Sequence, residues 1–436
     1  MLPMEAFFSS QIFLILQFSF EGKTQNLSLT KMNMLTPREQ VMESIFNDFY
    51  REKNMRFFSN NILSCIAVAV LISSNAWADH EPHAYSYNGA RSRANIIEFA
   101  PSAQPRLLNY KSVSSDPVVN RKMDDLLEGI FSQGIAGIVV KGEDVLYQKY
   151  KKGEDTNLYP AWSMTKSLVS LTVGHALCNG HIKSLDDLAQ QYVSELEGTV
   201  WGRASLRQLL QMRSGTSKRG LDSGGDYLYS NTSSGLDMVR GVFSVKDAYK
   251  RFGEVPDSVT PGSRFAYSNF DTDALGLVVA AASSQPFARY FETTVLKGAR
   301  LEHPSVFHLD RTGHPVTHAY FFATLRDFAR LGQYVIELHD GQNGNSCLKD
   351  YMGQALTPYT EATNSYNKSP IGYGFQFWLD TGFGQSKKEA VRMSGHQGQD
   401  IFMNLRTGKV AVVLGTKAIL REKSQSSTGI IEWLVR

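Results

Sequence analysis

The chain has 436 residues, of which 42% are hydrophobic and 20% are charged, and its formal net charge is +3. This composition is typical of a globular protein, and the length suffices for two or three domains or one large composite domain. The sequence contains no block of like charges, no basic patch interleaved with aromatic residues and no internal repeat. It therefore gives no support to the binding of a nucleic acid.

The N-terminal region carries the pattern of an export signal at residues 55–78. Arg56 supplies the positive charge, residues 62–72 form the apolar core, and residues 76–78 form a small-x-small cleavage site. Residues 1–54 do not resemble a domain, and we interpret them as an extension upstream of the biological start. A membrane anchor is the alternative, but the apolar core is shorter than the ~20 residues of a spanning helix. We therefore expect a periplasmic or secreted protein with no stable membrane insertion after signal cleavage.

The mature chain is expected to begin with a polar segment, followed by a β-hairpin. Residues 79–115 are polar, with scattered tyrosine, proline and serine, and we expect an extended N-terminal arm before a domain at 116–436. Two apolar runs, at 134–141 and 145–150, flank the turn sequence Gly-Glu-Asp at 142–144. This pattern predicts two antiparallel strands joined by a tight turn.

Ser163 and Lys166 stand at the start of a predicted helix. Residues 164–178 are apolar on nearly every face, which favours a helix buried in the centre of a domain, and Asn-Gly at 179–180 ends it. If the helix begins at or just before Ser163, positions i and i+3 share one face, so the lysine amine lies within hydrogen-bond reach of the serine hydroxyl. Burial disfavours the ammonium form, and a neutral lysine can take the proton of the serine. Ser163 is therefore the candidate nucleophile and Lys166 the candidate base.

The Ser-x-x-Lys pattern alone is weak evidence, because it occurs four times in this chain. The other three pairs lie upstream of the export signal, in a loop-like region and in a polar connection: Ser28/Lys31, Ser346/Lys349 and Ser365/Lys368. Only Ser163 opens an apolar helix. The alternative for Ser163 is an N-capping serine followed one turn later by a solvated lysine.

Helical patterns dominate the middle of the chain, and strand patterns return near its end. Helices are expected at 205–212, 244–252, 271–283, 286–296 and 324–338. Strands are expected at 391–394, 399–405 and 409–415, with a tight turn at 406–408 and a final helix at 424–435. We therefore predict an α+β fold, in which an antiparallel sheet from about 116–154 and 366–436 is flanked by helices and an all-helical subdomain is inserted at about 155–365. The cleft between the sheet and the subdomain is the expected ligand site.

The cysteines leave the question of a disulfide open. Cys65 lies within the signal peptide, so the mature chain keeps Cys178 and Cys347. An oxidising compartment permits a bond between them, but two cysteines so placed do not require one.

Four segments, in chain order, resemble the serine β-lactamase and penicillin-binding-protein superfamily, in particular its class C-like serine hydrolases. These segments are 162–167, 209–215, 261–271 and 394–399, and the resemblance covers about 120–436. The group includes esterases, D-amino-acid peptidases and amide hydrolases of the nylon-oligomer type. The resemblance implies a β-lactamase/transpeptidase-like fold and an acyl-enzyme on Ser163, with no metal and no cofactor.

The second motif of this family, Tyr-x-Asn, occurs twice here. We choose the copy at 267–269 over the copy at 229–231, because it follows a Pro-Gly turn, precedes a predicted helix and lies 104 residues after the candidate nucleophile, a separation similar to the family's. Tyr267 would relay the proton of the nucleophile to the leaving group, and Asn269 would hold the lysine and the substrate carbonyl. The alternative is a turn tyrosine beside an Asx-type asparagine.

The third motif, usually Lys-Thr-Gly or His-Thr-Gly on a strand beside the cleft, is degenerate here. Literal matches at 213–215, 311–313 and 406–408 fall at the end of a helix, between helices and in a hairpin turn. None of these places is a strand beside the cleft. Alignment of the Gly-x-x-Gly at 395–398 puts Met-Ser-Gly at 393–395 in the motif position.

This alignment assigns roles to three further residues. The backbone N–H groups of His396 and Ser163 would form an oxyanion hole. Gly395 would let the substrate approach the strand closely, and Ser394 would line the site. A Ser-His pair with the His396 imidazole as base is the alternative, but the lysine and the tyrosine already fill that role.

Together these features predict an exported serine hydrolase that cleaves an ester or amide bond in a small ester, amide or peptide-like substrate. A cation at the first position of the third motif would hold a substrate carboxylate, which β-lactams and D-alanyl peptides carry. Met393 cannot hold a carboxylate, but Arg311 or Arg392 could supply the missing cation. No glutamate motif of the class A β-lactamases is recognised. The alternatives are a D-alanyl-D-alanine carboxypeptidase or class C-type β-lactamase, and a non-catalytic penicillin-binding-like protein.

Overall fold

The computed structural model describes residues 95–109, 117–128, 134–215, 238–239, 242, 244–252, 260–263, 265–358, 360–363, 370–379 and 390–415. All of them belong to the second of the two units into which the chain divides, residues 73–436. The predicted upstream extension, signal peptide, final helix and second Tyr-x-Asn copy lie outside the described residues. Within the described ranges, no helix has the length and apolar character needed to cross a membrane.

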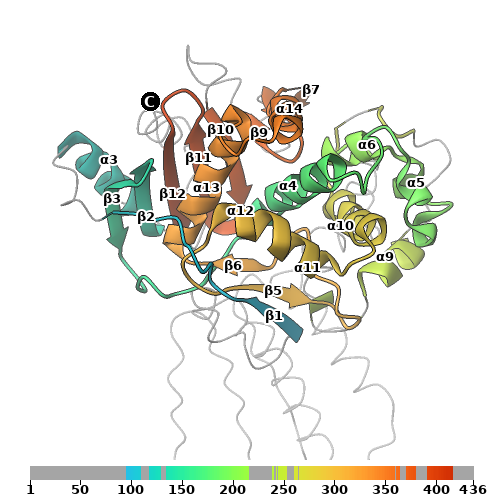
Figure 1. Cartoon of the computed structure of the whole chain (residues 1–436), viewed down its shortest axis with the longest axis horizontal. Coiled ribbons are helices and arrows are strands. Elements are labelled where there is room, and N and C mark those ends of the chain that lie inside the picture. Colours follow the sequence, from blue (N-terminus) through green and yellow to red (C-terminus); the bar gives the residue numbers. More distant parts are fainter. Residues whose placement is uncertain are drawn as a thin grey trace, which may run out of the picture. The chain divides into compact units, whose positions relative to one another are not determined.

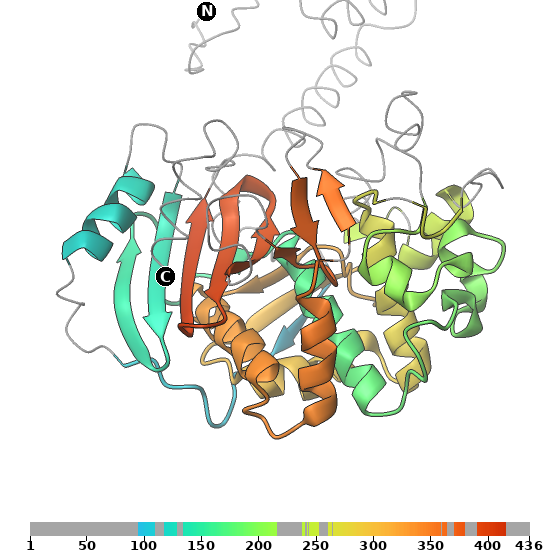
Figure 2. The ribbon, with the colours of Figure 1, turned by 90° about the horizontal axis from the view of Figure 1, so that it is seen from above.

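Strands from both ends of the described chain form an antiparallel sheet of eight described strands, in the order β3-β2-β12-β11-β10-β9-β8-β7 (Figure 2). Their bounds are β2 (Gly134–Lys141), β3 (Asp144–Tyr150), β7 (Thr360–Thr363), β8 (Pro370–Tyr373), β9 (Trp378–Leu379), β10 (Ala390–Gly395), β11 (Gln399–Asn404) and β12 (Lys409–Gly415). The predicted hairpin is confirmed as β2 and β3, and the three predicted C-terminal strands are β10, β11 and β12. Because β12 pairs with β2, the two ends of the domain close one sheet.

The strand β2, next to the edge strand β3, is buried on both faces, as its run of consecutive apolar residues requires. Ile138 packs in the main core, whereas its neighbour Val139 packs in a smaller cluster with residues of α3 (Pro117–Glu128). On the main-core face, α13 (Leu325–Asp340) lies against β2, β11 and β12 (Figure 1). Gly332 of α13 permits this approach, since a Cβ there would lie 2.6 Å from a methyl group of Val410.

Helix α4 (Met164–Cys178) packs against both the large sheet and the helical part of the domain. It contacts β10 and β11 on one side and α10 and α14 on the other. Its residues from Met164 to Gly174 are all buried, which confirms the predicted central helix. At its end, Cys178 forms a disulfide with Cys347, with Cα atoms 5.7 Å apart, so α4 is tied covalently to α14 (Ser346–Ala355).

The other predicted helices are present, with shifted ends. They are α6 (Leu206–Leu210), α9 (Val245–Phe252), α10 (Asn269–Ser283) and α11 (Phe287–Phe291), the last continued by a π-helical turn (Glu292–Leu296). The short helix α5 (Val200–Arg203) precedes them and the short helix α12 (Lys297–Ala299) follows them. Helix α14 was not predicted, because Ser346 was assigned to a loop-like region. Asn345 caps this helix by accepting a hydrogen bond from the Leu348 N–H at 3.0 Å. Few of its residues are buried, so its apolar pattern is weak.

A second, four-stranded sheet of described residues corrects the expectation that 155–365 is all-helical. Its order is β1-β5-β6-β4, with β1 (Asn95–Phe99), β5 (Ser305–Leu309), β6 (Phe321–Ala323) and β4 (Tyr159–Pro160). These strands have two to five residues each, and such short runs have no periodicity that separates a strand from a loop.

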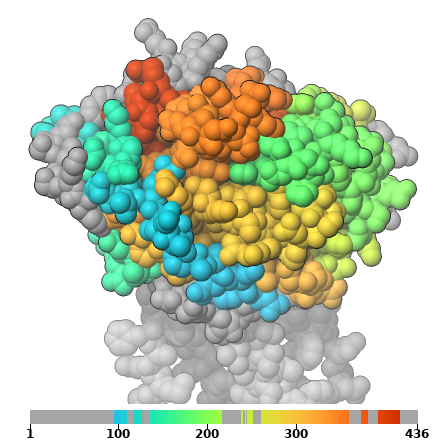
Figure 3. All heavy atoms as spheres, in the orientation of Figure 1, coloured from blue at the N-terminus to red at the C-terminus, as the bar shows by residue number. Residues whose placement is uncertain are grey.

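The segment that contains β1 was expected to be an extended arm. Its residues 95–109 run across the surface of the domain (Figure 3), where the Ser102 and Arg106 N–H groups donate to the Leu301 and Arg300 carbonyls. The small sheet therefore includes a strand from the N-terminal side of the domain.

Candidate active site

The backbone in front of Ser163 is fixed by the small sheet. β4 ends three residues before Ser163, and the Ala161 N–H donates to the Phe321 carbonyl at 2.8 Å. Trp162 then adopts a left-handed backbone with φ of 46°, which is uncommon for a residue with a side chain. Its indole packs edge-on against Tyr320 and His396, with ring centres 5.6 and 5.9 Å away. This turn places Ser163 at the N-terminus of α4.

Ser163 and Lys166 are in contact, and the geometry differs from that of a capping serine. Ser163 has a helical backbone (φ −66°, ψ −8°), and its side chain makes no capping hydrogen bond. The Lys166 Nζ lies 3.1 Å from the Ser163 Oγ. Lys166 is 1% exposed, so the alternative of a solvated lysine does not hold. The hydroxyl and the amine are arranged as a nucleophile beside a base.

The surroundings of Lys166 favour its neutral form. Burial lowers the pKa of Lys166 to about 7, and the negative charge of Asp273 opposes that shift. The Nζ donates a hydrogen bond to the His318 carbonyl at 2.7 Å and lies 5.2 Å from the centre of the Tyr267 ring. A substantial fraction of Lys166 is therefore deprotonated near neutral pH.

Tyr267 and Asn269 lie at the start of α10, next to this pair. Ser268 caps the helix, and Asn269 in its first position is buried. The Tyr267 ring stacks on Trp378, with centres 5.6 Å apart and planes at 20°. Phe265 and Tyr373 complete an aromatic cluster around it. Of the two Tyr-x-Asn copies, the described one thus places its tyrosine beside the lysine.

Gly395 is required by a backbone contact. A Cβ at this position would lie 2.4 Å from the Ala161 carbonyl oxygen and 3.2 Å from the Trp162 Cβ. Its φ of −120° is ordinary, so space and not backbone conformation demands glycine. The expected reason was a close approach of substrate, whereas the structure shows a close approach of the residues that precede Ser163. The end of β10 is thereby held beside the residues that precede Ser163.

The rest of the third motif lies on the same strand. Met393 is fully buried, Ser394 is partly buried opposite Asp400, and His396 is exposed in a 3₁₀ turn. Arg311, one of the two possible replacement cations, pairs instead with Asp247 at 2.5 Å. None of the three literal matches falls on β10.

Sequence reasoning missed two buried carboxylates in the first turns of α10. Asp271 accepts hydrogen bonds from the Trp201 indole at 3.0 Å and from the Ser214 hydroxyl at 2.7 Å, and burial raises its pKa to about 7. Asp273 is bonded to Thr317 and His318. An Asp-Thr-Asp sequence in an otherwise apolar helix was the available signal.

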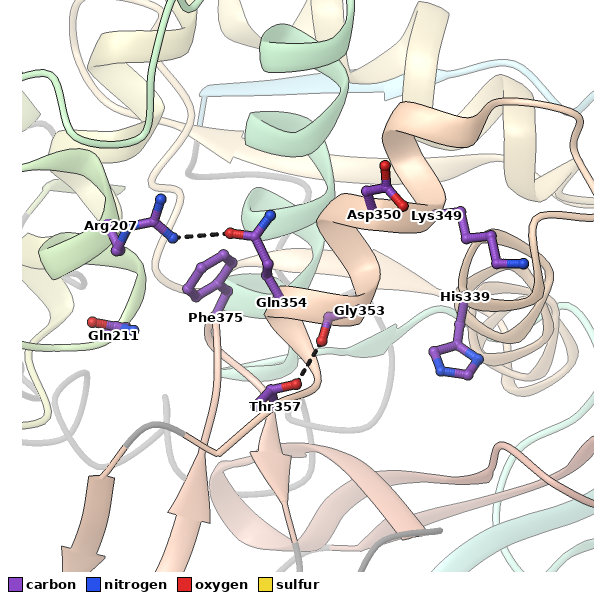
Figure 4. Close-up of a pocket in the computed structure, with 9 residues that line it drawn as sticks. All are labelled: Arg207, Gln211, His339, Lys349, Asp350, Gly353, Gln354, Thr357 and Phe375. Atoms are coloured by element: carbon purple, nitrogen blue, oxygen red, sulfur yellow. Dashed lines mark hydrogen bonds between the residues drawn. The ribbon is translucent and has the colours of Figure 1, made fainter.

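A separate cavity of about 520 Å³ lies between α6, α13 and α14 (Figure 4). Its wall includes Arg207, which donates to the Gln354 side chain at 3.0 Å and lies over the Phe375 ring. None of the predicted site residues lines it. The described residues also contain no group of three or more His, Cys, Asp or Glu side chains placed to hold a metal ion.

Comparison with known proteins supplies the family context. A family model described as Beta-lactamase matches residues 119–426. A Pseudomonas fluorescens protein named Beta-lactamase is 26% identical over 194 residues, 43% of this chain and 49% of that protein, so the chain spans about half the length of this relative.

Solved structures show the same fold. One is described as "Putative 6-aminohexanoate-dimer hydrolase from Bacillus anthracis", with a TM-score of 0.63 and 18% identity, covering 80% of this chain and 92% of that one. Another, "EstCE1, a hydrolase with promiscuous acyltransferase activity", has a TM-score of 0.57 and 15% identity, covering 74% of this chain and all (100%) of the other. These likenesses confirm the predicted β-lactamase/transpeptidase-like α+β fold.

Proposed function

The chain belongs to the beta-lactamase family, and from this membership we propose that it is a serine hydrolase that cleaves an ester or amide bond through an acyl-enzyme on Ser163. One observation carries the proposal. The Ser163 hydroxyl lies 3.1 Å from the amine of Lys166, whose burial lowers its pKa to about 7. A poor nucleophile thus has a base that is available at neutral pH.

The reaction follows from the placement of these groups. As the Ser163 Oγ attacks the substrate carbonyl, its proton passes to Lys166, and the backbone N–H groups of Ser163 and His396 stabilise the oxyanion. The contact of Gly395 with Ala161 supports this assignment, since it holds residue 396 beside the nucleophile. Tyr267 delivers the proton to the leaving group, and water then releases the acyl group. Asn269 and Ser394 orient the substrate.

The substrate is a small ester, amide or peptide-like molecule. Two observations favour an ester or amide without a carboxylate: Met393 is buried and uncharged, and the described wall beside Tyr267 is aromatic. The names of two structural neighbours, a putative 6-aminohexanoate-dimer hydrolase and the hydrolase EstCE1, agree with the assignment as a hydrolase. No metal and no cofactor takes part in the proposed reaction.

A fluorophosphonate probe tests the enzyme assignment. We expect one adduct per chain on Ser163, identified by mass spectrometry of the labelled peptide. Ser163→Ala should abolish labelling, whereas Ser346→Ala should not, because Ser346 and Lys349 form an exposed Ser-x-x-Lys pair elsewhere in the fold. Absence of labelling in the folded wild-type protein would point to a non-catalytic binding protein.

A substrate panel tests the chemistry. p-Nitrophenyl esters of graded chain length are compared with nitrocefin and a D-alanyl-D-alanine peptide. The esters should be turned over fastest. Rapid nitrocefin or peptide hydrolysis with inert esters would replace the proposal with a class C-type β-lactamase or a D-alanyl-D-alanine carboxypeptidase.

The pH dependence of activity should report Lys166. Because the neutral amine is the active form and the pKa of Lys166 is about 7, kcat/KM should fall below pH 7, by about tenfold per pH unit. A rate that stays constant down to pH 5 would contradict this role.

The free energy of unfolding should also depend on pH through Lys166. Because the pKa of Lys166 is lowered from its ordinary value of 10.5, the contribution of this residue to stability is fully present above pH 10.5 and is lost as the pH falls to about 7.

We propose export to the periplasm or the medium, supported by the signal pattern at 55–78 and by the disulfide between Cys178 and Cys347. N-terminal sequencing of the native protein should find a start at residue 79. A native N-terminus at residue 1 would refute export through this signal.

A further inference from the structure

We propose that Asp273 is a positioning residue for the base, because it holds the turn whose carbonyl accepts a hydrogen bond from Lys166. The inference rests on the proposed function, since it assigns Lys166 the role of base. It adds a residue that touches neither the nucleophile nor the substrate.

Asp273 is bound to one turn of the chain by three hydrogen bonds. Its Oδ1 accepts from the Thr317 hydroxyl at 2.9 Å and from the His318 N–H at 3.0 Å. Its Oδ2 lies 2.7 Å from the His318 Nδ1. All three side chains are buried, and a buried carboxylate is tolerated only when its oxygens are satisfied in this way. The conformation of the turn between β5 and β6 is therefore fixed from α10.

The same turn orients the amine of Lys166. The His318 residue binds Asp273 through its N–H and ring, and its carbonyl accepts a hydrogen bond from the Lys166 Nζ at 2.7 Å. A neutral amine has two N–H donors and one lone pair. With one N–H directed at the His318 carbonyl, the lone pair is free to face the Ser163 Oγ, 3.1 Å away. A displaced carbonyl would let the amine rotate and present an N–H instead.

The charge of Asp273 has a second effect on the amine. Burial lowers the pKa of Lys166, and Asp273 raises it. Burial is the largest single influence and would raise the pKa of Asp273, but the charges of His318 and Lys166 and the hydrogen bonds from His318 and Thr317 together hold that pKa below its ordinary value, so the carboxylate is charged in the working pH range.

Other titratable groups surround Lys166 and Asp273. His318, His314 and Tyr249 interact with Asp273, and Tyr267 faces Lys166. Asp271, two residues earlier on α10, instead accepts hydrogen bonds from Trp201 and Ser214 and does not act on the pKa of Lys166. It is therefore a second buried carboxylate of the same helix for comparison.

The test compares Asp273→Asn with Asp271→Asn. The rate of fluorophosphonate labelling of Ser163 and the kcat/KM for an ester are measured from pH 5 to 9. Asp273→Asn should move the acid limb down by about one pH unit, because the charge that favoured the ammonium is removed, and should lower the plateau rate by about tenfold or more. Asp271→Asn should leave the acid limb in place, whatever its effect on thermal stability.

One further variant, His318→Asn, separates the explanations. His318→Asn keeps an N–H donor near the position of Nδ1 and keeps the backbone carbonyl, so it should preserve the acid limb; a shift would assign that limb to the imidazole and overturn the proposal. An unmoved limb in Asp273→Asn, or equal shifts in both Asp variants, would also overturn it. If wild-type protein is not labelled at all, the proposed function fails; if it is labelled and Asp273→Asn matches it, only this inference fails.

One measurement needs no variant enzyme to be active. Carboxyl-¹³C NMR of the wild-type protein should show Asp273 ionised at pH 7 despite its burial. A neutral carboxyl signal for Asp273 at that pH would refute the proposal, even if Asp273→Asn cannot be obtained in folded form.

Discussion

Lys166→Arg is expected to lower kcat by about 10³-fold or more while the protein stays folded. Arginine keeps the positive charge, but a guanidinium cannot give up its proton in the working pH range. Its planar fork also differs from the ammonium that fits beside the Ser163 hydroxyl and the His318 carbonyl. The variant therefore separates a base from a fixed positive charge.

The loss is measured as kcat for the best ester, with thermal melting as the check on folding. Lys349→Arg is the matched control, since Lys349 belongs to an exposed Ser-x-x-Lys pair and should keep activity within about twofold of wild type. If Lys166→Arg retains more than a tenth of wild-type activity, the lysine is only an electrostatic aid. The exposed imidazole of His396 would then be the next candidate for the base.

Gly395→Ala is expected to lower kcat by about 10²-fold through displacement of the nucleophile. The added methyl group would lie 2.4 Å from the Ala161 carbonyl oxygen, and the atom in its way belongs to backbone. Ala161 is bonded to Phe321 of the small sheet and lies two residues before Ser163, so relief of the clash moves either the nucleophile or the end of β10. Both sides of the proposed oxyanion hole depend on that contact.

Gly353→Ala is the control that separates the clash at Gly395 from the general effect of replacing a glycine with alanine. Gly353 is exposed on α14, and an added Cβ would meet nothing within 4 Å. This variant should keep wild-type kcat and gain roughly 0.5–1 kcal/mol in the free energy of unfolding, since alanine is the better helix former. Wild-type kcat in Gly395→Ala would show that β10 tolerates a shift and that residue 396 is not held as tightly as we infer.

The parts of the site that the sequence predicts well are those with local geometry. Ser163 and Lys166 are separated by one helical turn, so their approach needs only the helix that the apolar run predicts. The hairpin of β2 and β3 is likewise joined by a short turn. In both cases the interacting groups are close in the chain.

The parts that could not be predicted depend on partners far away in the chain. The sequence Ser-x-x-Asp at 268–271 fits an ordinary helix N-terminus, in which Ser268 is the N-cap and the first turn is acidic. That Asp273 instead faces His318, 45 residues further on, follows only from the fold. Gly395 also fits several explanations until Ala161 is placed against it. The short strands β4 and β6 gave no periodic signal, although they fix the backbone before the nucleophile.

The disulfide between Cys178 and Cys347 places the residues of the proposed site in different parts of the chain. It closes a covalent ring that contains Tyr267, Asp273 and His318, whereas Ser163 and His396 lie on the two tails that leave the ring. A single peptide-bond cut anywhere inside the ring would therefore leave all residues of the proposed site in one covalently connected molecule. A cut between Ser163 and Cys178, or between Cys347 and His396, would instead detach part of the site, so tolerance to proteolysis should differ between the ring and these two segments.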